Sequence, residues 1–282
     1  MDLLTVNEKN LTPEERNALQ SQNTRLVTQF QAESLEKNAR KHWDLFYKRN
    51  EDKFFRDRHW TTREFNELLD ENNCENTNRI KTLLEIGCGV GNLIFPLIEE
   101  NANLFVIACD LSPRAVEIVK NHKLYNEDRM KVFVTDITTD DIFMKVDLNS
   151  VDIVTMVFVI SAIHPDKFVT TLKNVFKLLR PGGVLLFRDY GLYDMAQLRF
   201  KAGHKISENF YMRQDGTRSY YFSTNTLENI VKEAGFEIIS NIYIHRRTIN
   251  KKENIDVPRI FVQGKFKKPD CKLGIFCLIV LL

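Results

Sequence analysis

Several features are missing from this sequence of 282 residues. Its five cysteines form no Cys-x-x-Cys pair, so neither a zinc site nor a disulfide framework is indicated. The N-terminal residues resemble no signal or transit peptide. The last ten residues are strongly apolar, but a run of ten is about half the length of a membrane-spanning helix. We therefore expect a cytoplasmic or nuclear protein without a metal ion or a membrane association.

A large net charge is missing too, because 40 Lys and Arg side chains nearly balance 38 Asp and Glu side chains. The basic residues are nevertheless clustered in two stretches. Lys37–Arg63 contains nine Lys and Arg against four acids, and Arg246–Lys272 contains nine against three. Such stretches fit a phosphate-rich ligand that crosses one face, and they equally fit two solvated surfaces without a ligand.

Apolar segments of strand length alternate with helical segments from residue 81 onward. This alternation predicts an α/β fold with a doubly wound, mostly parallel, Rossmann-like sheet of seven strands. The last two strands have only a loop between them, which predicts a C-terminal β-hairpin. Asn225 and Glu228 are spaced as the capping box of the last helix. The predicted strands are Thr82–Ile86, Leu104–Cys109, Met130–Val134, Val151–Val159, Val184–Phe187, Phe236–His245 and Arg259–Phe266.

Three segments fall outside this alternation. Residues 1–80 begin with a polar helix predicted over 13–41 and continue into a stretch rich in aromatics and bases, so we expect a helical N-terminal extension. Residues 191–222 interrupt the domain 81–268 without a regular period. Residues 269–282 form an atypical apolar tail.

A glycine-rich turn follows the first predicted strand. Gly87 and Gly89 let the backbone approach a ligand closely, and the helix that begins beyond them offers free N–H groups. Asp110 ends the second strand, where a carboxylate can accept both hydroxyl groups of a ribose. The turn alone is a weak signal, and its position between a strand and a helix strengthens it.

The third strand ends in a second acid. Asp136 is placed to accept a hydrogen bond from an adenine amino group, with apolar Ile137 and Val157 on either side of the ring. Acids at strand ends also occur in α/β proteins without any such ligand. The two acids together predict an adenosine site.

The glycine spacing discriminates between cofactors. A nicotinamide site normally shows G-x-G-x-x-G around a pyrophosphate, whereas this turn has the shorter G-x-G-x-G spacing. Glu85 lies just before the glycines, and an acid-lined pocket suits the cationic sulfonium and amino groups of S-adenosylmethionine. We therefore expect this methyl donor as the cofactor.

These motifs resemble the class I S-adenosylmethionine-dependent methyltransferases, and within them a family that modifies tRNA. Glu85–Asn92 and Ala108–Ala115 carry the first resemblance. Four further motifs are similar to the methyltransferase-like enzymes that form 3-methylcytidine in the tRNA anticodon loop. They are Trp43–Lys48, Phe54–Trp60, Phe187–Gly191 and Arg213–Ser219.

The resemblance implies a tRNA (cytidine-N3) methyltransferase acting on nucleotide 32. Trp60–Phe65 is most similar to the member that acts on serine tRNAs and works with seryl-tRNA synthetase, so we expect these partners. It also implies that residues 1–80 bind tRNA and cover the cofactor, and that 191–222 bind the substrate. The apolar ending departs from the family, where a polar ending is expected.

The resemblance also assigns the cofactor contacts. Trp43 and Tyr47 are four residues apart, hence on one helix face, and are expected to close over the methionine end of the cofactor. Without the resemblance, an aromatic stripe packed on the core explains them better. The contacts that the family implies are Trp43, Tyr47, Gly87, Asp110, Asp136, Ile137 and Val157.

Cytosine N3 carries a lone pair and no hydrogen, so its methylation needs no base. Alignment of the reacting atoms and stabilisation of the growing positive charge are then sufficient. Asp189 ends the fifth strand, where it can accept from the exocyclic amine, and Tyr190 can stack on the base. Asp189 can instead be a structural partner of Arg188 or Arg218. Since N3 lies on the Watson–Crick edge, the base must be unpaired or flipped.

Bases and aromatics interleave in residues 54–63, a mixture that holds phosphates and stacks exposed bases. Basic residues between 188 and 218 extend this predicted surface. A single arginine here is more often a solvated charge, so the cluster carries the prediction. The predicted RNA-binding residues are Phe55, Arg56, Arg58, His59, Trp60, Arg63, Arg188, Arg199, Arg213 and Arg218.

Two other functions fit the same fold. A small-molecule methyltransferase would need neither the basic stretches nor the segment 191–222. A non-catalytic tRNA-binding subunit would not need an intact glycine turn together with Asp110 and Asp136.

Overall fold

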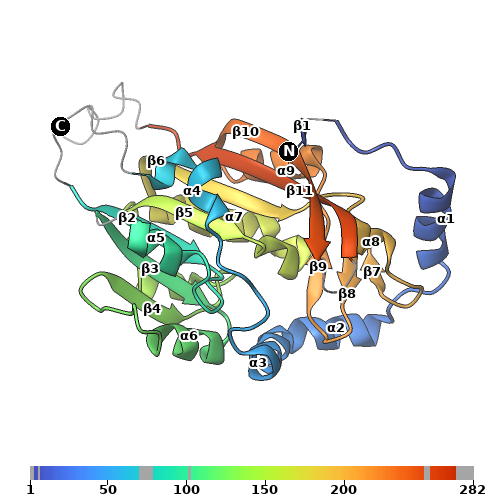
Figure 1. Ribbon diagram of the computed structural model, residues 1–282, viewed down its shortest axis with the longest axis horizontal. Helices are drawn as coiled ribbons and strands as arrows, with labels where there is room; N and C mark the ends of the chain where they lie inside the picture. The colour runs from blue at the N-terminus through green and yellow to red at the C-terminus, as the bar shows by residue number, and fades with distance from the viewer. Residues whose placement is uncertain (1–2, 6, 70–78, 101–102, 251–254, 271–282) are drawn as a thin grey trace, which may run out of the picture.

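The computed structural model describes residues 3–5, 7–69, 79–100, 103–250 and 255–270. At its centre is an eight-stranded sheet in the order β1-β10-β11-β6-β5-β2-β3-β4 (Figure 1). The pairs among β2 to β6 are parallel, whereas β6, β11, β10 and β1 pair antiparallel. The strands are β1 (Leu3–Thr5), β2 (Lys81–Ile86), β3 (Leu104–Asp110), β4 (Met130–Val134), β5 (Val151–Val157), β6 (Leu179–Tyr190), β10 (Glu237–Asn250) and β11 (Ile255–Lys267).

The seven predicted strands and the C-terminal hairpin are confirmed. The eighth strand, β1, pairs with β10 at the edge of the sheet, with Leu3 opposite His245. Its three residues carry too short a pattern to be recognised in a sequence. The predicted tail lies outside the described residues beyond residue 270.

Both faces of the sheet are buried. Neighbouring residues of one strand point to opposite faces, so Leu83 and Ile153 belong to one apolar cluster while Leu84 and Val154 belong to the other. Helices cover each face, as a doubly wound fold requires. They are α5 (Ile94–Glu100) and α6 (Pro113–Lys120) on one face, and α7 (Phe168–Leu178) and α9 (Thr224–Glu233) on the other.

The strand order reverses between β2 and β5, and a crevice for ligands is expected there, outside the carboxyl ends of the strands. Short 3-10 turns also occur in the described residues. They are η1 (Asn66–Leu68), η2 (Asp140–Met144), η3 (Ile160–Ala162) and η4 (Pro165–Lys167).

The single helix predicted over 13–41 is wrong. The segment forms α1 (Pro13–Gln22), α2 (Gln29–Lys37) and the start of α3 (Ala39–Asn50), and α4 (Trp60–Glu64) follows. Thr28 caps α2 by accepting from the backbone of Gln31. Between the first two helices, the backbone N–H of Val27 donates to the carbonyl of Lys205 at 2.8 Å, so tertiary pairing replaces a helical turn.

Residues 191–222 contain α8 (Met195–Leu198) and a three-stranded sheet of β7 (Lys205–Ser207), β8 (Phe210–Met212) and β9 (Arg218–Tyr220). Figure 1 shows this sheet beside the blue N-terminal helices α1 and α2. Gln22 is fully buried there and donates to the carbonyls of Gln197 and Phe200 at 2.9 and 3.1 Å. The extension and the segment 191–222 are therefore packed together as one substructure.

The predicted capping box of α9 is also wrong. The helix begins after Ser223, whose hydroxyl accepts from the backbone of Thr226 at 3.0 Å. Ser223 precedes Asn225 by two residues and satisfies the free N–H groups first.

Among the described residues, no helix has the length and apolar character needed to span a bilayer. No group of three or more His, Cys, Asp or Glu side chains in the same residues is arranged to hold a metal ion.

Candidate active site

The turn after β2 requires glycine at two positions. Gly87 and Gly89 adopt positive φ angles of 65° and 54°. A Cβ atom on Gly87 would lie 2.6 Å from a methyl group of Val159. One on Gly89 would lie 2.8 Å from the hydroxyl oxygen of Tyr47. Only a bare backbone fits between these side chains and the ligand space beside them.

Asp110 at the end of β3 holds this turn in place. Its carboxylate accepts from the backbone N–H of Gly89 and of Ser112, each at 2.9 Å. Burial raises the pKa of Asp110, and these backbone donors oppose the rise. Each carboxylate oxygen has a second lone pair, so Asp110 can still accept the hydroxyl groups of a ribose.

A pocket, called the first pocket below, lies along the carboxyl ends of the parallel strands. Residues of α2 and α3 form its other side. Trp43 and Tyr47 share one face of α3, with their ring centroids 6.2 Å apart. Six of the predicted cofactor contacts line this pocket: Trp43, Tyr47, Gly87, Asp110, Asp136 and Ile137.

Glu85 of β2 is buried just before the glycine turn and does not line this pocket. Its Oε2 atom is buried without a hydrogen-bond partner among the described residues. Burial raises the pKa of Glu85 to about 8. The residues that do line the pocket fit S-adenosylmethionine, because the pocket combines the carboxylates of Asp110 and Asp136 with the ring of Trp43. Carboxylates accept from ribose hydroxyl, amino and ammonium groups, and an aromatic face attracts a cation such as the sulfonium.

A second pocket adjoins the first, and the two share Trp43, Tyr47, Gly87, Phe158 and Ala162 as lining residues. The shared residues mean that a group bound in one pocket lies next to a group bound in the other. The other lining residues include Phe55, Arg58, Gly89, Val157, Tyr190 and Arg213, all of which were predicted as site residues.

Aromatic rings and guanidinium groups make up much of the second pocket. The rings of Phe158 and Tyr190 lie 5.0 Å apart with an angle of 35° between their planes. Arg58 lies 5.5 Å from the centroid of Phe158, and Arg213 lies 5.2 Å from that of Tyr190. This mixture of flat apolar faces and cations suits a nucleobase attached to phosphates.

Phe158 was missed by the sequence reasoning. It follows β5 directly and has a φ of 62°, a conformation that costs a bulky side chain about 1–3 kcal/mol. Its N–H donates to the carbonyl of Arg188 at 2.8 Å, which fixes this backbone against β6. Nothing in the pattern around Phe158 indicates a positive φ, because no glycine or asparagine lies beside it.

Comparisons with known proteins agree with this geometry. The methyltransferase domain family matches residues 84–185. The chain is 58% identical over 245 residues to tRNA N(3)-cytidine methyltransferase METTL6 of Mus musculus, covering 86% of each chain. It is 54% identical over 259 residues to the protein of the same name in Homo sapiens, covering 92% of this chain and 90% of the human one. The chain belongs to the tRNA N(3)-cytidine methyltransferase family.

A solved structure supports the fold independently. The S-adenosylmethionine-dependent methyltransferase from Anabaena variabilis has a TM-score of 0.58 at 16% identity, covering 82% of this chain and 95% of that one. The family and the fold together show that this chain is a tRNA methyltransferase that depends on S-adenosylmethionine.

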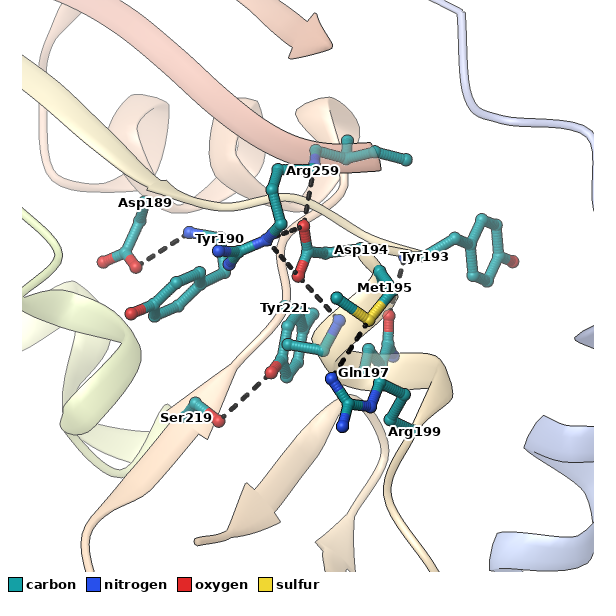
Figure 2. A network of polar contacts seen from close by, with 12 residues as sticks. Asp189, Tyr190, Tyr193, Asp194, Met195, Gln197, Arg199, Ser219, Tyr221 and Arg259 are labelled. Carbon is teal, nitrogen blue, oxygen red and sulfur yellow. Dashed lines mark hydrogen bonds and ion pairs between the residues drawn. The ribbon is translucent and has the colours of Figure 1, made fainter. Parts of the chain in front are cut away.

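Asp189 lines neither of the two pockets. It is fully buried, and one carboxylate oxygen accepts from the backbone N–H of Ser161 at 3.0 Å. The other accepts from the N–H of Tyr190 at 2.9 Å (Figure 2). Burial raises the pKa of Asp189 to about 6. Because Asp189 lies outside the lining of both pockets, the structure shows no direct route from it to a bound base, and the predicted contact stays a prediction. Arg188 and Arg218, the two predicted alternative partners of Asp189, pair with Glu64 and Glu36 respectively.

Arg188 is likewise turned away from solvent. It is 1% exposed, its Nη1 donates to Glu64 at 2.6 Å, and its guanidinium lies 4.3 Å from the centroid of the Trp60 ring. Arg246 contacts the other oxygen of Glu64. The prediction that Arg188 binds RNA is therefore corrected: the side chain attaches α4 to the sheet.

The remaining predicted RNA-binding residues divide by exposure. Arg218 is 4% exposed and paired with Glu36, and Trp60 is half-buried against Arg188. The others are on the surface of the enzyme, where His59 lies 3.6 Å from Glu100. They are Arg56, His59, Arg63 and Arg199.

Tyr190 is held from behind by a pair that the sequence reasoning missed. Arg259 of β11 lies 5.9 Å from the Tyr190 ring centroid and donates to Asp194 at 2.9 Å (Figure 2). Asp194 is fully buried and also accepts from the backbone of Ile260 at 2.7 Å. The two residues are 65 positions apart in the sequence, so no local pattern links them.

Polar contacts attach the N-terminal extension over the first pocket. Asp44 of α3 accepts from the Ser112 hydroxyl at 2.9 Å, next to Asp110. Glu36 of α2 pairs with Lys167 at 2.5 Å and with Arg218. Burial opposes ionisation of Glu36, but these two hydrogen bonds prevail and lower its pKa. The extension therefore closes one side of the pocket through charges fixed in the methyltransferase domain.

Proposed function

We propose that this chain methylates N3 of a cytidine in the anticodon loop of tRNA, at nucleotide 32, with S-adenosylmethionine as the methyl donor. Relatives that are 58% and 54% identical to it are named for cytidine N3 methylation of tRNA. One observation carries the proposal within the molecule. The aromatic and cationic second pocket shares five lining residues with the pocket that fits the methyl donor.

The geometry supports transfer without a general base. When bound, the cofactor supplies an electrophilic methyl group, and cytosine N3 offers its lone pair directly. The rings of Phe158 and Tyr190 can hold the flipped base flat and attract the positive charge that develops on it. The neighbouring guanidinium groups of Arg58 and Arg213 are donors suited to the cytosine O2 atom and to phosphates.

Serine tRNAs are the proposed substrates, with seryl-tRNA synthetase as a partner in the cytoplasm or nucleus. The support is the similarity of Trp60–Phe65 to the serine-specific member. Residues 1–80 and 191–222 are proposed to bind the tRNA together, since Gln22 and Val27 already join them. Arg56 and Arg63 are exposed on the same extension and are available for phosphates.

The test is methylation by the purified chain of serine and non-serine tRNAs with cytidine at nucleotide 32, read by nucleoside mass spectrometry. The assay is run with and without seryl-tRNA synthetase. We expect 3-methylcytidine in serine tRNAs and a higher rate with the synthetase. Tyr190→Ala should lower the rate about tenfold to hundredfold, since base stacking contributes ~1–3 kcal/mol. Tyr190→Phe, which keeps the ring, should remain within about twofold, because the stacking face is unchanged.

Binding of the methyl donor, measured by calorimetry, should be the same in the parent and both Tyr190 variants. If the chain binds the donor but forms no 3-methylcytidine in any tRNA, the small-molecule alternative replaces this proposal. Equal methylation of serine and non-serine tRNAs would leave the cytidine activity and remove the serine specificity.

A further inference from the structure

Asp189 and Ser161 form a hydrogen-bonded pair between β6 and η3, behind the second pocket. Asp189 is fully buried, and Ser161 is 2% exposed. The carboxylate accepts from the Ser161 backbone N–H at 3.0 Å, and the Ser161 hydroxyl lies close enough to the carboxylate to lower its pKa. Asp189 accepts in addition from the N–H of Tyr190, so this carboxylate fixes two residues of the pocket wall at once.

The neighbouring Asp189 carboxylate determines whether the Ser161 hydroxyl donates or accepts a hydrogen bond in the second pocket. A hydroxyl group has one hydrogen and two lone pairs. An ionised carboxylate next to the hydroxyl attracts its hydrogen, which leaves the oxygen as an acceptor for a second hydrogen bond. Burial raises the pKa of Asp189 to about 6, so the carboxylate is still mainly ionised, and therefore an acceptor, at neutral pH. Ser161 lines the second pocket together with Tyr190.

An acceptor in this position distinguishes the two pyrimidines of RNA. Cytosine carries an exocyclic amine next to N3 and donates there, whereas uracil carries a carbonyl oxygen at the same place and accepts. We propose that Ser161 is the specificity-determining residue of this enzyme: its hydroxyl oxygen accepts from the cytosine amine, and Asp189 positions it. This inference rests on the proposed cytidine methylation and names the group that reads the base.

Asn92 is the competing side chain in the pocket. Its amide nitrogen donates to the Phe55 carbonyl at 3.4 Å and to Asp57 at 3.1 Å, which leaves its oxygen as an acceptor. Those contacts hold Asn92 against the segment that carries Phe55, whereas Ser161 is bonded to the residue before Tyr190. Because Tyr190 is the ring proposed to stack on the base, Ser161 is the better placed of the two.

The test replaces the target cytidine in a tRNA by the nucleoside of 2-pyrimidinone, which keeps N3 and O2 and lacks the amine. The full chain is assayed with both tRNAs and S-adenosylmethionine, and the ratio of their kcat/KM values is measured. We expect the parent enzyme to prefer cytidine about tenfold or more, since an unsatisfied buried acceptor is costly. In Ser161→Ala the ratio should fall about tenfold, because the cytosine amine then has no partner, and the preference that remains is set by the weaker N3 nucleophile of a ring without the amine.

Three further variants complete the experiment. Ser161→Cys keeps the volume with a weak acceptor and should also lower the ratio. Asp189→Asn should reduce the ratio, since an amide offers one acceptor oxygen in place of two; an unchanged ratio would remove Asp189 as the positioning residue. Ser150→Ala removes a hydroxyl outside both pockets and should keep the parent's ratio.

A parent enzyme that methylates both tRNAs equally would overturn the proposal without any variant. So would a full preference retained in Ser161→Ala, or a preference abolished only in Asn92→Ala. Absence of 3-methylcytidine in the parent's cytidine tRNA would instead reject the proposed function. Calorimetry with the methyl donor, expected to be unchanged in Ser161→Ala, separates loss of the contact from loss of the fold.

Discussion

The two pockets of this enzyme differ in where their walls come from along the chain. The first is built mainly at the tips of consecutive parallel strands, with Gly87, Asp110 and Asp136 following β2, β3 and β4 in order. The second takes residues from distant segments, including Phe55, Ser161 and Arg213. A shared edge of one sheet brings the first set together, whereas tertiary packing must bring the second set together.

The fold itself therefore provides the cofactor pocket, whereas the second pocket needs contacts that are particular to this chain. Strand tips converge in any doubly wound sheet, so a cofactor pocket needs few supporting contacts of its own. The second pocket instead depends on buried ion pairs such as Arg188–Glu64 and Asp194–Arg259. Some substitutions should therefore disrupt the second pocket and leave the first intact, and others should do the reverse.

The largest expected effect is that of Arg188→Ala on folding. Removing this cation leaves Glu64 partly buried with one partner fewer and empties the space over Trp60. Breaking a buried pair in this way typically costs about 3–5 kcal/mol of unfolding free energy, measured here by chemical denaturation. Arg63→Ala, on the exposed face of the same helix α4, is the matched control and should change stability by less than about 0.5 kcal/mol. An unchanged stability in Arg188→Ala would show that the second pocket needs no such anchor.

The next effect belongs to the first pocket. Asp110→Ala removes the acceptor of two backbone N–H groups and of the proposed ribose contact. Hydrogen bonds to charged groups contribute ~1.5–3 kcal/mol, so the affinity for the methyl donor should fall about hundredfold in calorimetry. Asp152→Ala is the control, since this buried acid of β5 accepts from Arg79 and from the Thr82 backbone instead. It should lower stability and leave cofactor affinity intact; equal affinities in the two variants would contradict the assignment of Asp110.

The same comparison explains what the sequence could predict. The strands and the convergence of Asp110 and Asp136 follow from local apolar runs and from the geometry of parallel sheets. The roles of Asp189 and Arg188 do not, because a sequence shows that a charge is present but not whether a partner buries it. Asp189 faces backbone donors of η3, and Arg188 faces Glu64, which is 124 residues away.

Two further failures have the same physical origin. The helix predicted over 13–41 is interrupted where Val27 pairs with Lys205, a contact between residues 178 positions apart. The positive φ of Phe158 is imposed by its bond to β6 and opposes its own preference. In both cases tertiary contacts override local propensity.

The smallest expected effect concerns the exposed arginines of the extension. Arg56 and Arg63 are proposed to contact phosphates, and a single exposed cation contributes little in water. Replacing either by Ala should weaken tRNA binding about twofold to fivefold at moderate salt and reduce the slope of log affinity against log salt by about one. Fluorescence titration at several salt concentrations measures both quantities.

Lys232→Ala on α9 is the control, because this exposed lysine lies outside both pockets and pairs with Glu228. Its salt slope should equal that of the parent enzyme. A phosphate contact changes the slope, whereas a general loss of positive charge changes affinity alone and does so equally for any surface cation. If Lys232→Ala and Arg63→Ala gave the same slope, the tRNA would be attracted by overall charge, and the extension would carry no phosphate contact at these arginines.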